Sequence, residues 1–280
     1  MPAAFVVVPE WQGSVSARAM SHADGAHAIS GDLPSAATVV VDVPVEAGDA
    51  LGTGVQRYSA LRRVNERMRE AMRGLGRTPI AVGGDCGIAS ASVANAAAGD
   101  ADSLAVLWLD AHPDLNTPES SPSGAFNGMV LRSILGEGAD GLALADGERI
   151  APSRLVLGGV RAVDDGEQSF IDEHGVAMVG VDRFGDAQAV VDAVVATGAT
   201  RVYVHIDLDV LDPSAIAGLS YPLPFGADPD DVVALVRAVV GRLPLAGASI
   251  AGFAPASPDA ALDDLPTILR LIGALASGAS

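Results

Sequence analysis

Short apolar runs alternate with helix-like stretches along almost the whole chain, and this alternation restricts the possible folds more than any other feature. Runs that are apolar at every position indicate strands with both faces buried. Strands separated by helices predict a mostly parallel sheet with helices on each side. We therefore expect a doubly wound α/β fold in which residues 1–280 form a single domain. The expected strands cover residues 5–8, 38–45, 79–82, 104–109, 154–157, 176–181, 201–206 and 248–253, and the expected helices cover residues 56–72, 87–98, 187–195, 230–240 and 260–275.

The charge of the chain restricts its partners. The formal net charge is −18, and all 17 basic residues are arginines. Nucleic acids and anionic membrane surfaces are bound by basic patches, so neither is an expected partner, whereas a cationic small molecule is. The absence of lysine also excludes Schiff-base chemistry and a P-loop lysine.

Neither a membrane segment nor a secretion signal is expected. The longest apolar runs, such as residues 104–109, are far shorter than a membrane span. The first ten residues lack the basic start and the long apolar stretch of a signal peptide, and Glu10 interrupts them. Cys86 is the single cysteine and cannot form a disulfide within the chain, although a bridge between two chains is compatible with it. We therefore expect a cytoplasmic protein.

The carboxyl ends of the strands are where a ligand binds in a sheet of this kind. Residues 83–86 and 158–161 lie at two of these ends. The glycine-rich residues 25–37 and the proline- and serine-rich residues 118–123 are expected to be surface loops that flank the site.

Acidic residues follow two of the apolar runs. Asp110, His112 and Asp114 follow one run, and Asp207 and Asp209 follow another. In extended segments, alternate residues point to the same face, so each set is expected to point one way. The sequence therefore predicts that five polar side chains converge at one edge of the sheet.

Four carboxylates and an imidazole cannot share a dry pocket without a compensating charge, because their repulsion would raise their pKa values. Oxygen-rich ligand sets suit Mn²⁺, and shared carboxylates can bridge two ions about 3.5–4 Å apart with a nucleophilic hydroxide between them. Taken singly, the first motif could equally be an ordinary loop, and the second a strand cap or a magnesium–phosphate site. Their joint occurrence at strand ends favours a pair of divalent ions.

These motifs resemble the arginase and agmatinase ureohydrolases over nearly the whole chain. The family pattern runs Gly-Gly-Asp-His, Asp-Ala-His-x-Asp, Ser-Gly-x-x-His-Gly, Asp-x-Asp-x-x-Asp-Pro and Glu-x-Asn-Pro, and this chain matches the second and fourth parts completely. The resemblance implies an arginase-like fold, two manganese ions and a homo-oligomer, either a trimer or a hexamer. It also implies that Asp110 and Asp207 bridge the ions, that His112 and Asp209 bind one ion, and that Asp114 binds the other.

Two further segments resemble the arginase branch. The run from Asp114 through Asn116 to Ser123 implies that Asn116 and Ser123 hold the α-carboxylate of an amino acid. Asp164 and Glu167 match the acids near the substrate α-amino group. Taken alone, these two acids could equally begin a helix, where its dipole favours negative charge.

Cys86 departs from the pattern, because it stands where the family has its first histidine ligand. A thiolate is a softer ligand, so the ion beside it is expected to be zinc-like, weakly held or absent. One alternative is a buried thiol that acts as a small hydrophobe. Another is a nucleophilic thiol, since a helix start would lower its pKa; such a thiol-dependent hydrolase would survive chelation but not alkylation.

Two other departures affect the chemistry. Asn127 replaces a histidine; it can orient substrate but cannot carry protons. His205 precedes Asp207 by two residues and shares its face, so it is a candidate proton carrier, the alternative being a neutral core histidine. Gly252 replaces the glutamate that grips the guanidinium, which removes a charge-assisted contact of roughly 1.5–3 kcal/mol.

Among these enzymes the chain resembles in particular the amidinohydrolases that act on N-hydroxyarginine, which also carry cysteine at the first ligand position. Residues 114–119, 128–131 and 205–211 carry this resemblance, although that branch keeps the glutamate. We therefore expect metal-dependent hydrolysis of the guanidino C–N bond of an arginine-like amino acid, releasing urea or a substituted urea. Asp114 would help to protonate the leaving amine. The alternative is a pseudoenzyme that binds a ligand or partner without turnover, but an intact ligand set is costly to keep without metal.

Overall fold

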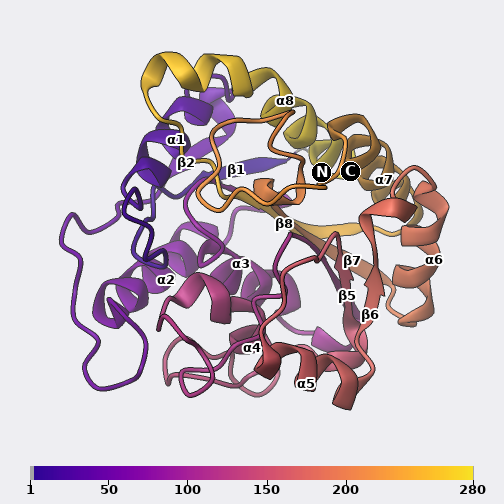
Figure 1. The fold of residues 1–280 in the computed structure, drawn as a ribbon, viewed down its shortest axis with the longest axis horizontal. Coiled ribbons are helices and arrows are strands. Elements are labelled where there is room, and N and C mark those ends of the chain that lie inside the picture. The colour runs from indigo at the N-terminus through magenta and orange to yellow at the C-terminus, as the bar shows by residue number, and fades with distance from the viewer. Residues whose placement is uncertain (1–2, 280) are drawn as a thin grey trace.

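A computed structural model describes residues 3–279 and places every strand of this part in one parallel sheet (Figure 1). The strand order is β2-β1-β3-β8-β7-β4-β5-β6. The strands are β1 (Ala4–Val7), β2 (Thr38–Val40), β3 (Pro79–Val82), β4 (Leu104–Leu109), β5 (Leu155–Gly158), β6 (Ala177–Val179), β7 (Arg201–Asp207) and β8 (Leu245–Ala251).

Helices cover both faces of this sheet. They are α1 (Ser21–Ser30), α2 (Tyr58–Met72), α3 (Ile88–Ala97), α4 (Val130–Ile134), α5 (Asp165–His174), α6 (Ala187–Ala196), α7 (Pro229–Arg242) and α8 (Pro258–Ala276). The buried apolar residues of α1, α6, α7 and α8 belong to one hydrophobic core and those of α2 to α5 to a second. The predicted doubly wound α/β fold is therefore confirmed. Within residues 3–279, no helix is long and apolar enough to cross a bilayer.

The central strand β4 shows how the apolar runs build this fold. All six of its residues are buried. Leu107 and Leu109 face the core under α6 and α7, while Val106 and Trp108 face the core under α2 and α3. A strand buried on both faces must be apolar at every position. In the pairing of β4 with β7, Leu109 lies opposite Ile206, so the residues that follow these two strands emerge side by side.

Several elements differ from the sequence-based expectation. The helices α1, α4 and α5 were not expected, and β2 ends at Val40 instead of Val45. The prediction of a surface loop over residues 25–37 is wrong, because its first half belongs to α1 and buries Ala26 and Ile29. A Cβ on Gly25 would lie 2.2 Å from the carbonyl oxygen of Phe253, so only glycine lets α1 pack this closely.

Candidate metal centre and cavity

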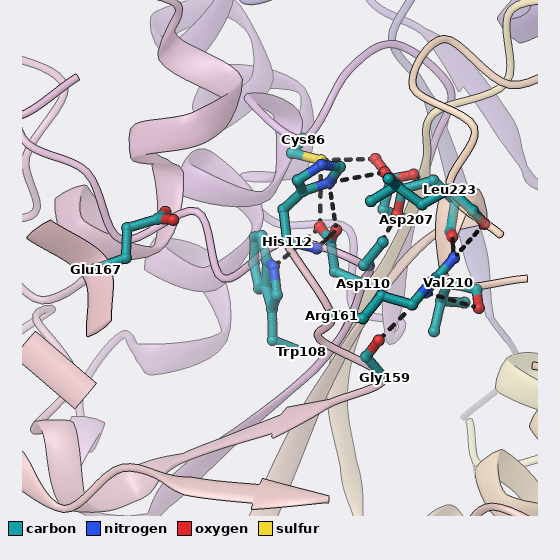
Figure 2. Close-up of polar contacts among 12 residues, drawn as sticks. Cys86, Trp108, Asp110, His112, Gly159, Arg161, Glu167, Asp207, Val210 and Leu223 are labelled. Atoms are coloured by element: carbon teal, nitrogen blue, oxygen red, sulfur yellow. Dashed lines mark hydrogen bonds and ion pairs between the residues drawn. The ribbon is translucent and has the colours of Figure 1, made fainter. Parts of the chain in front are cut away.

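Three segments that lie far apart in the sequence meet at the carboxyl ends of β3, β4 and β7. Asp110 follows β4, Asp207 ends β7, and Cys86 lies between β3 and α3. The Sγ atom of Cys86 lies 2.8 Å from Oδ2 of Asp207 and 3.8 Å from Oδ2 of Asp110 (Figure 2). These side chains are therefore close enough to share one cation.

His112 forms the second half of the cluster. Its Nδ1 atom lies 2.9 Å from Oδ2 of Asp209 and 3.5 Å from Oδ1 of Asp110. Backbone groups hold these carboxylates in place: the amide of Ala111 donates to Asp209 Oδ1, and the amide of His112 donates to Asp110 Oδ1. Asp110 thus lies between Cys86 on one side and His112 on the other.

Burial sets the charge state of the acids. Desolvation, followed by repulsion from Asp209, raises the pKa of Asp207 to about 7. Desolvation and repulsion from Asp110 raise the pKa of Asp209 to about 6, and the pKa values of Asp110 and Asp114 are raised for the same kinds of reason. A bound divalent cation would stabilise all four as carboxylates.

Burial lowers the pKa of His112, but hydrogen bonds and charge attraction from Asp110 and Asp209 outweigh it and raise that pKa to about 12. A proton on this ring compensates the negative charge of Asp110 and Asp209, as a bound cation would. The ring must lose that proton before Nδ1 can act as a metal ligand.

The donor set fits a pair of divalent cations. Oδ2 of Asp114 is buried and has no hydrogen-bond partner among residues 3–279. The backbone of Asp114 has φ 51°, in the left-handed region that non-glycine residues rarely adopt. Two groups of side chains each bring their ligand atoms within 4.8 Å of one another: Asp110 with His112 and Asp209, and Asp110 with Cys86 and His205.

A cavity of about 210 Å³ lies above this cluster. All of the sequence-predicted site residues except His205 line it, namely Cys86, Asp110, His112, Asp114, Asn116, Ser123, Asn127, Asp164, Glu167, Asp207 and Asp209. Ser121 and Pro122, from the predicted flanking loop, line it too. His205 is fully buried beneath the cluster, where its Nδ1 atom lies 2.7 Å from Oγ of Ser249.

The residues expected to hold an amino acid line the cavity and make hydrogen bonds within the protein. Nδ2 of Asn116 donates to Asp164 at 2.9 Å, and Oδ1 of Asn116 accepts from Ser120 at 2.8 Å. Oγ of Ser123 accepts from the amide of Ala125. These side chains are thus held in fixed positions by contacts within the protein.

Glu167 is held by the backbone. Its Oε1 atom accepts from the amide of Leu115 and its Oε2 atom from the amide of Asp164, each at 2.9 Å. Helix α5 begins at Asp165, so Asp164 and Glu167 do begin a helix. In Figure 2, Glu167 lies well apart from Cys86 and Asp207. A role toward substrate for these two acids remains a prediction.

Cys86 does not have the lowered pKa on which the alternative of a nucleophilic thiol depends. Burial, followed by repulsion from Asp207, Asp114 and Asp110, raises the pKa of the thiol well above its ordinary value. Helix α3 begins only at Ile88, two residues later. Burial and the surrounding acids therefore outweigh any effect of the helix terminus on this thiol.

Gly252 adopts a conformation that few other residues could take. Its φ is 88°, in the left-handed region, and an added Cβ would lie 2.3 Å from Oδ1 of Asp207. The Asp207 carboxylate thus occupies the space into which a side chain at position 252 would project. The backbone conformation at position 252 and the nearby Asp207 carboxylate therefore leave no room for the glutamate that the family has at this position.

Three residues at the site were missed by sequence reasoning. Trp108 donates from Nε1 to Asp110 Oδ2 at 3.1 Å, and Tyr221 lines the cavity edge-on to His112. Arg161 donates to the carbonyl oxygens of Asp209 and Leu223 (Figure 2). Arg161 belongs to residues 158–161, a glycine-containing strand end, and this position could have indicated a site residue. Tyr221 lies in an irregular segment without such a signal.

Comparison with known proteins gives a consistent result. The model of the arginase family matches residues 16–262. The arginase of Bacillus caldovelox is 35% identical over 196 residues, which cover 65% of each chain. The N(omega)-hydroxy-L-arginine amidinohydrolase of Streptomyces lavendulae is 33% identical over 218 residues, which cover 78% of this chain and 76% of that one. The aligned part spans 61–65% of the arginases of Bacillus caldovelox and Staphylococcus aureus.

Solved structures share the fold over almost the full length. The Entamoeba histolytica arginase, solved in complex with L-ornithine, has a TM-score of 0.81 at 22% identity and covers 97% of this chain and 98% of its own. The native Bacillus caldovelox arginase has a TM-score of 0.75 at 26% identity, with the same coverage.

Proposed function

Since this chain belongs to the arginase family, we propose that it is a metal-dependent hydrolase that cleaves the guanidino C–N bond of an arginine-like amino acid. The observation that carries this proposal is the cluster of buried Cys86, Asp110, Asp207 and Asp209 with half-buried His112, all of which line a 210 Å³ cavity. Such a cluster is costly to bury unless cations compensate its charge.

The chain offers ligands for two Mn²⁺ ions or for one Mn²⁺ and a softer ion beside Cys86. Asp110 belongs to both groups of ligand atoms and would be shared, and Asp207, 2.8 Å from the Cys86 sulfur, would be the second shared carboxylate. His112 and Asp209 would serve one ion, and Asp114 the other. Bound divalent cations would supply Lewis acidity, polarising water and the guanidino group.

The protein side chains would position the substrate and handle its protons. Asp114 lines the cavity and would carry, on a carboxylate oxygen that does not bind an ion, the proton that the leaving amine takes up. Asn127 would orient the guanidino group by hydrogen bonds, because an amide cannot carry a proton at neutral pH. Asn116 and Ser123 would face the α-carboxylate, and Asp164 with Glu167 the α-amino group.

N-hydroxyarginine suits this site better than arginine does. A hydroxylated guanidine has a lower pKa, so it depends less on a carboxylate partner and on a proton shuttle. The left-handed backbone at Gly252 leaves no room for the carboxylate partner. Asn127 stands in place of the histidine that would shuttle protons. The 33% identity with the amidinohydrolase of Streptomyces lavendulae supports the same substrate.

We further propose that the chain is a single domain acting as a cytoplasmic homo-oligomer, a trimer or a hexamer. One sheet carries all eight strands of residues 3–279, which supports the single domain. The assembly rests on family resemblance alone.

The competing proposal is a pseudoenzyme that binds a ligand without turnover. The three departures at Cys86, Asn127 and Gly252 favour it. Steady-state release of urea from arginine and of hydroxyurea from N-hydroxyarginine decides between the two. We expect kcat/KM to be higher for N-hydroxyarginine by about tenfold or more, since one charge-assisted contact of roughly 1.5–3 kcal/mol is missing for arginine. Protein with two bound ions that releases neither product would be the pseudoenzyme.

A further inference from the structure

We infer that His205 is a metal ligand: its Nε2 atom joins Cys86 Sγ and Asp110 in binding the cation on the Cys86 side of the cluster. One ring nitrogen of His205, the Cys86 sulfur and an Asp110 oxygen lie within 4.8 Å of one another. The inference rests on the proposed metal centre but not on turnover. It adds to that centre a ligand that the sequence motifs did not mark.

The free ring nitrogen of His205 is the first argument. His205 is fully buried, and its Nε2 atom has no hydrogen-bond partner among residues 3–279. A buried polar atom without a partner is destabilising, so such atoms are rare and require an explanation. A cation shared with Cys86 and Asp110 would be the missing partner.

The support around the ring is the second argument. Nδ1 of His205 lies 2.7 Å from Oγ of Ser249, which can accept a hydrogen bond from a protonated Nδ1. In this tautomer the free lone pair of the ring is on Nε2. The hydroxyl of Tyr203 donates to the same Oγ atom at 2.8 Å. Metal-binding histidines usually have this arrangement, in which a hydrogen bond to the other nitrogen fixes the tautomer and the orientation of the ring.

Trp108 links His205 to the rest of the cluster. Its ring stacks on the His205 ring with 3.7 Å between centroids, and its Nε1 atom donates to Asp110. Trp108, His205 and Ser249 lie opposite one another on β4, β7 and β8, so they form one row across the sheet. One tryptophan thereby positions two of the three ligands.

The ligand set determines which ion binds. Cys86, His205 and Asp110, with Asp207 only 2.8 Å from the sulfur, supply one thiolate, one imidazole and carboxylate oxygens. Four ligands of this kind suit tetrahedral Zn²⁺ or Co²⁺ better than Mn²⁺. The two sites would therefore differ in their preferred metal. A nitrogen bound to a cation cannot also shuttle protons, so this role and the proton-carrier role predicted for His205 exclude each other.

Cobalt binding to the metal-free protein tests the inference without measuring turnover. Wild type should bind one Co²⁺ with thiolate-to-cobalt charge-transfer absorption, which C86S should lose. H205N keeps a polar atom near Ser249 but lacks Nε2. It should bind this Co²⁺ at least about tenfold more weakly, because even the loss of a residue that only supports a metal ligand weakens binding by about that factor. H205Q, whose side chain reaches the Nε2 position, should recover part of the affinity. Unchanged affinity and spectrum in H205N would overturn the inference.

A second measurement covers the case in which H205N does not fold. Pulsed electron paramagnetic resonance of the cobalt-loaded H112Q variant reports any remaining imidazole nitrogen at the ions. Nitrogen coupling that persists in H112Q assigns His205 as a ligand, and its complete loss contradicts the inference. If wild type binds no divalent cation at all, the proposed metal centre fails together with the inference.

Discussion

The thiol of Cys86 donates a hydrogen bond to Oδ2 of Asp207 at 2.8 Å, across a sequence separation of 121 residues. Both groups are buried, and both have raised pKa values because burial and neighbouring acids disfavour their charged forms. The thiol proton shared in this hydrogen bond lies between two groups that could both bind a cation. This contact joins the most unusual residue of the site to one of its shared acids.

We predict that C86S changes the metal preference of the protein. Serine replaces sulfur by a harder oxygen of similar size, which weakens the binding of soft ions more than that of Mn²⁺. Metal analysis after loading with equal amounts of Mn²⁺ and Zn²⁺ should show a higher ratio of manganese to zinc in C86S than in wild type. An unchanged ratio would show that Cys86 does not bind an ion.

Alkylation is predicted to be slow at Cys86. The thiol is 4% exposed and its pKa is raised, so little reactive thiolate is available in the native, metal-free protein. Mass spectrometry after iodoacetamide treatment should find Cys86 unmodified under conditions that fully label the unfolded chain. Rapid labelling together with turnover that survives chelation would instead support the thiol-dependent hydrolase.

Gly252 is predicted not to tolerate a side chain. G252A places a Cβ against Asp207 and forces an L residue into the left-handed region, which alone costs about 1–2 kcal/mol. Thermal unfolding should show lower stability, and metal content should fall because Asp207 is displaced. The matched control is G241A in helix α7, where an added Cβ meets no atom of residues 3–279 within 4 Å and alanine should stabilise by about 0.5–1 kcal/mol. Equal stability of the two variants would contradict the requirement for glycine at position 252.

Asn127 is predicted to limit turnover of arginine. N127H places a proton-carrying imidazole at the cavity, and positioned proton carriers contribute about 10²-fold or more to rate. The value of kcat for arginine should therefore rise more than kcat for N-hydroxyarginine, up to about a hundredfold. N127Q, which cannot titrate, is the control. A parallel change for both substrates in N127H would argue against a missing proton carrier.

His22 is predicted to make folding sensitive to acid. Burial, followed by repulsion from Arg18, lowers the pKa of His22 to about 4, from an ordinary value of about 6.5. Only the unfolded chain takes up this proton as the pH falls from about 6.5 to about 4, so stability that is complete above 6.5 is lost across that window, by roughly 3 kcal/mol.

Denaturant unfolding at several pH values measures this loss. H22Q keeps a partner for Ser220, whose Oγ lies 2.9 Å from Nε2 of His22, but it cannot titrate. Its stability should therefore fall less between pH 6.5 and 4 than that of wild type. H27Q, which changes an exposed histidine of the same helix, should follow wild type. If H22Q follows wild type as well, His22 does not contribute to the acid sensitivity.

Sequence patterns predicted the features that depend on local order. Apolar runs identified β4 and β7 and so placed the acidic residues that follow them at one edge of the sheet. The extended geometry expected for these residues is wrong, because Asp209 lies in a 3-10 turn and Asp114 has a left-handed backbone. The surroundings of His205 could not be predicted, because they depend on the register of three strands that are distant in sequence. Helix α1 was missed for another reason: His22, Gly25, Ala26 and Ile29 form its buried face, and this set has too little apolar character to indicate a helix.

Metal-dependent product release tests the central claim most directly. Metal-free protein is titrated with Mn²⁺ while bound metal and hydroxyurea released from N-hydroxyarginine are measured in the same samples. We predict no product without metal and a release rate that rises with bound metal and levels off at two ions per chain. Product release that is independent of bound metal, or two bound ions with no product, would contradict the assignment of this chain as a metal-dependent hydrolase.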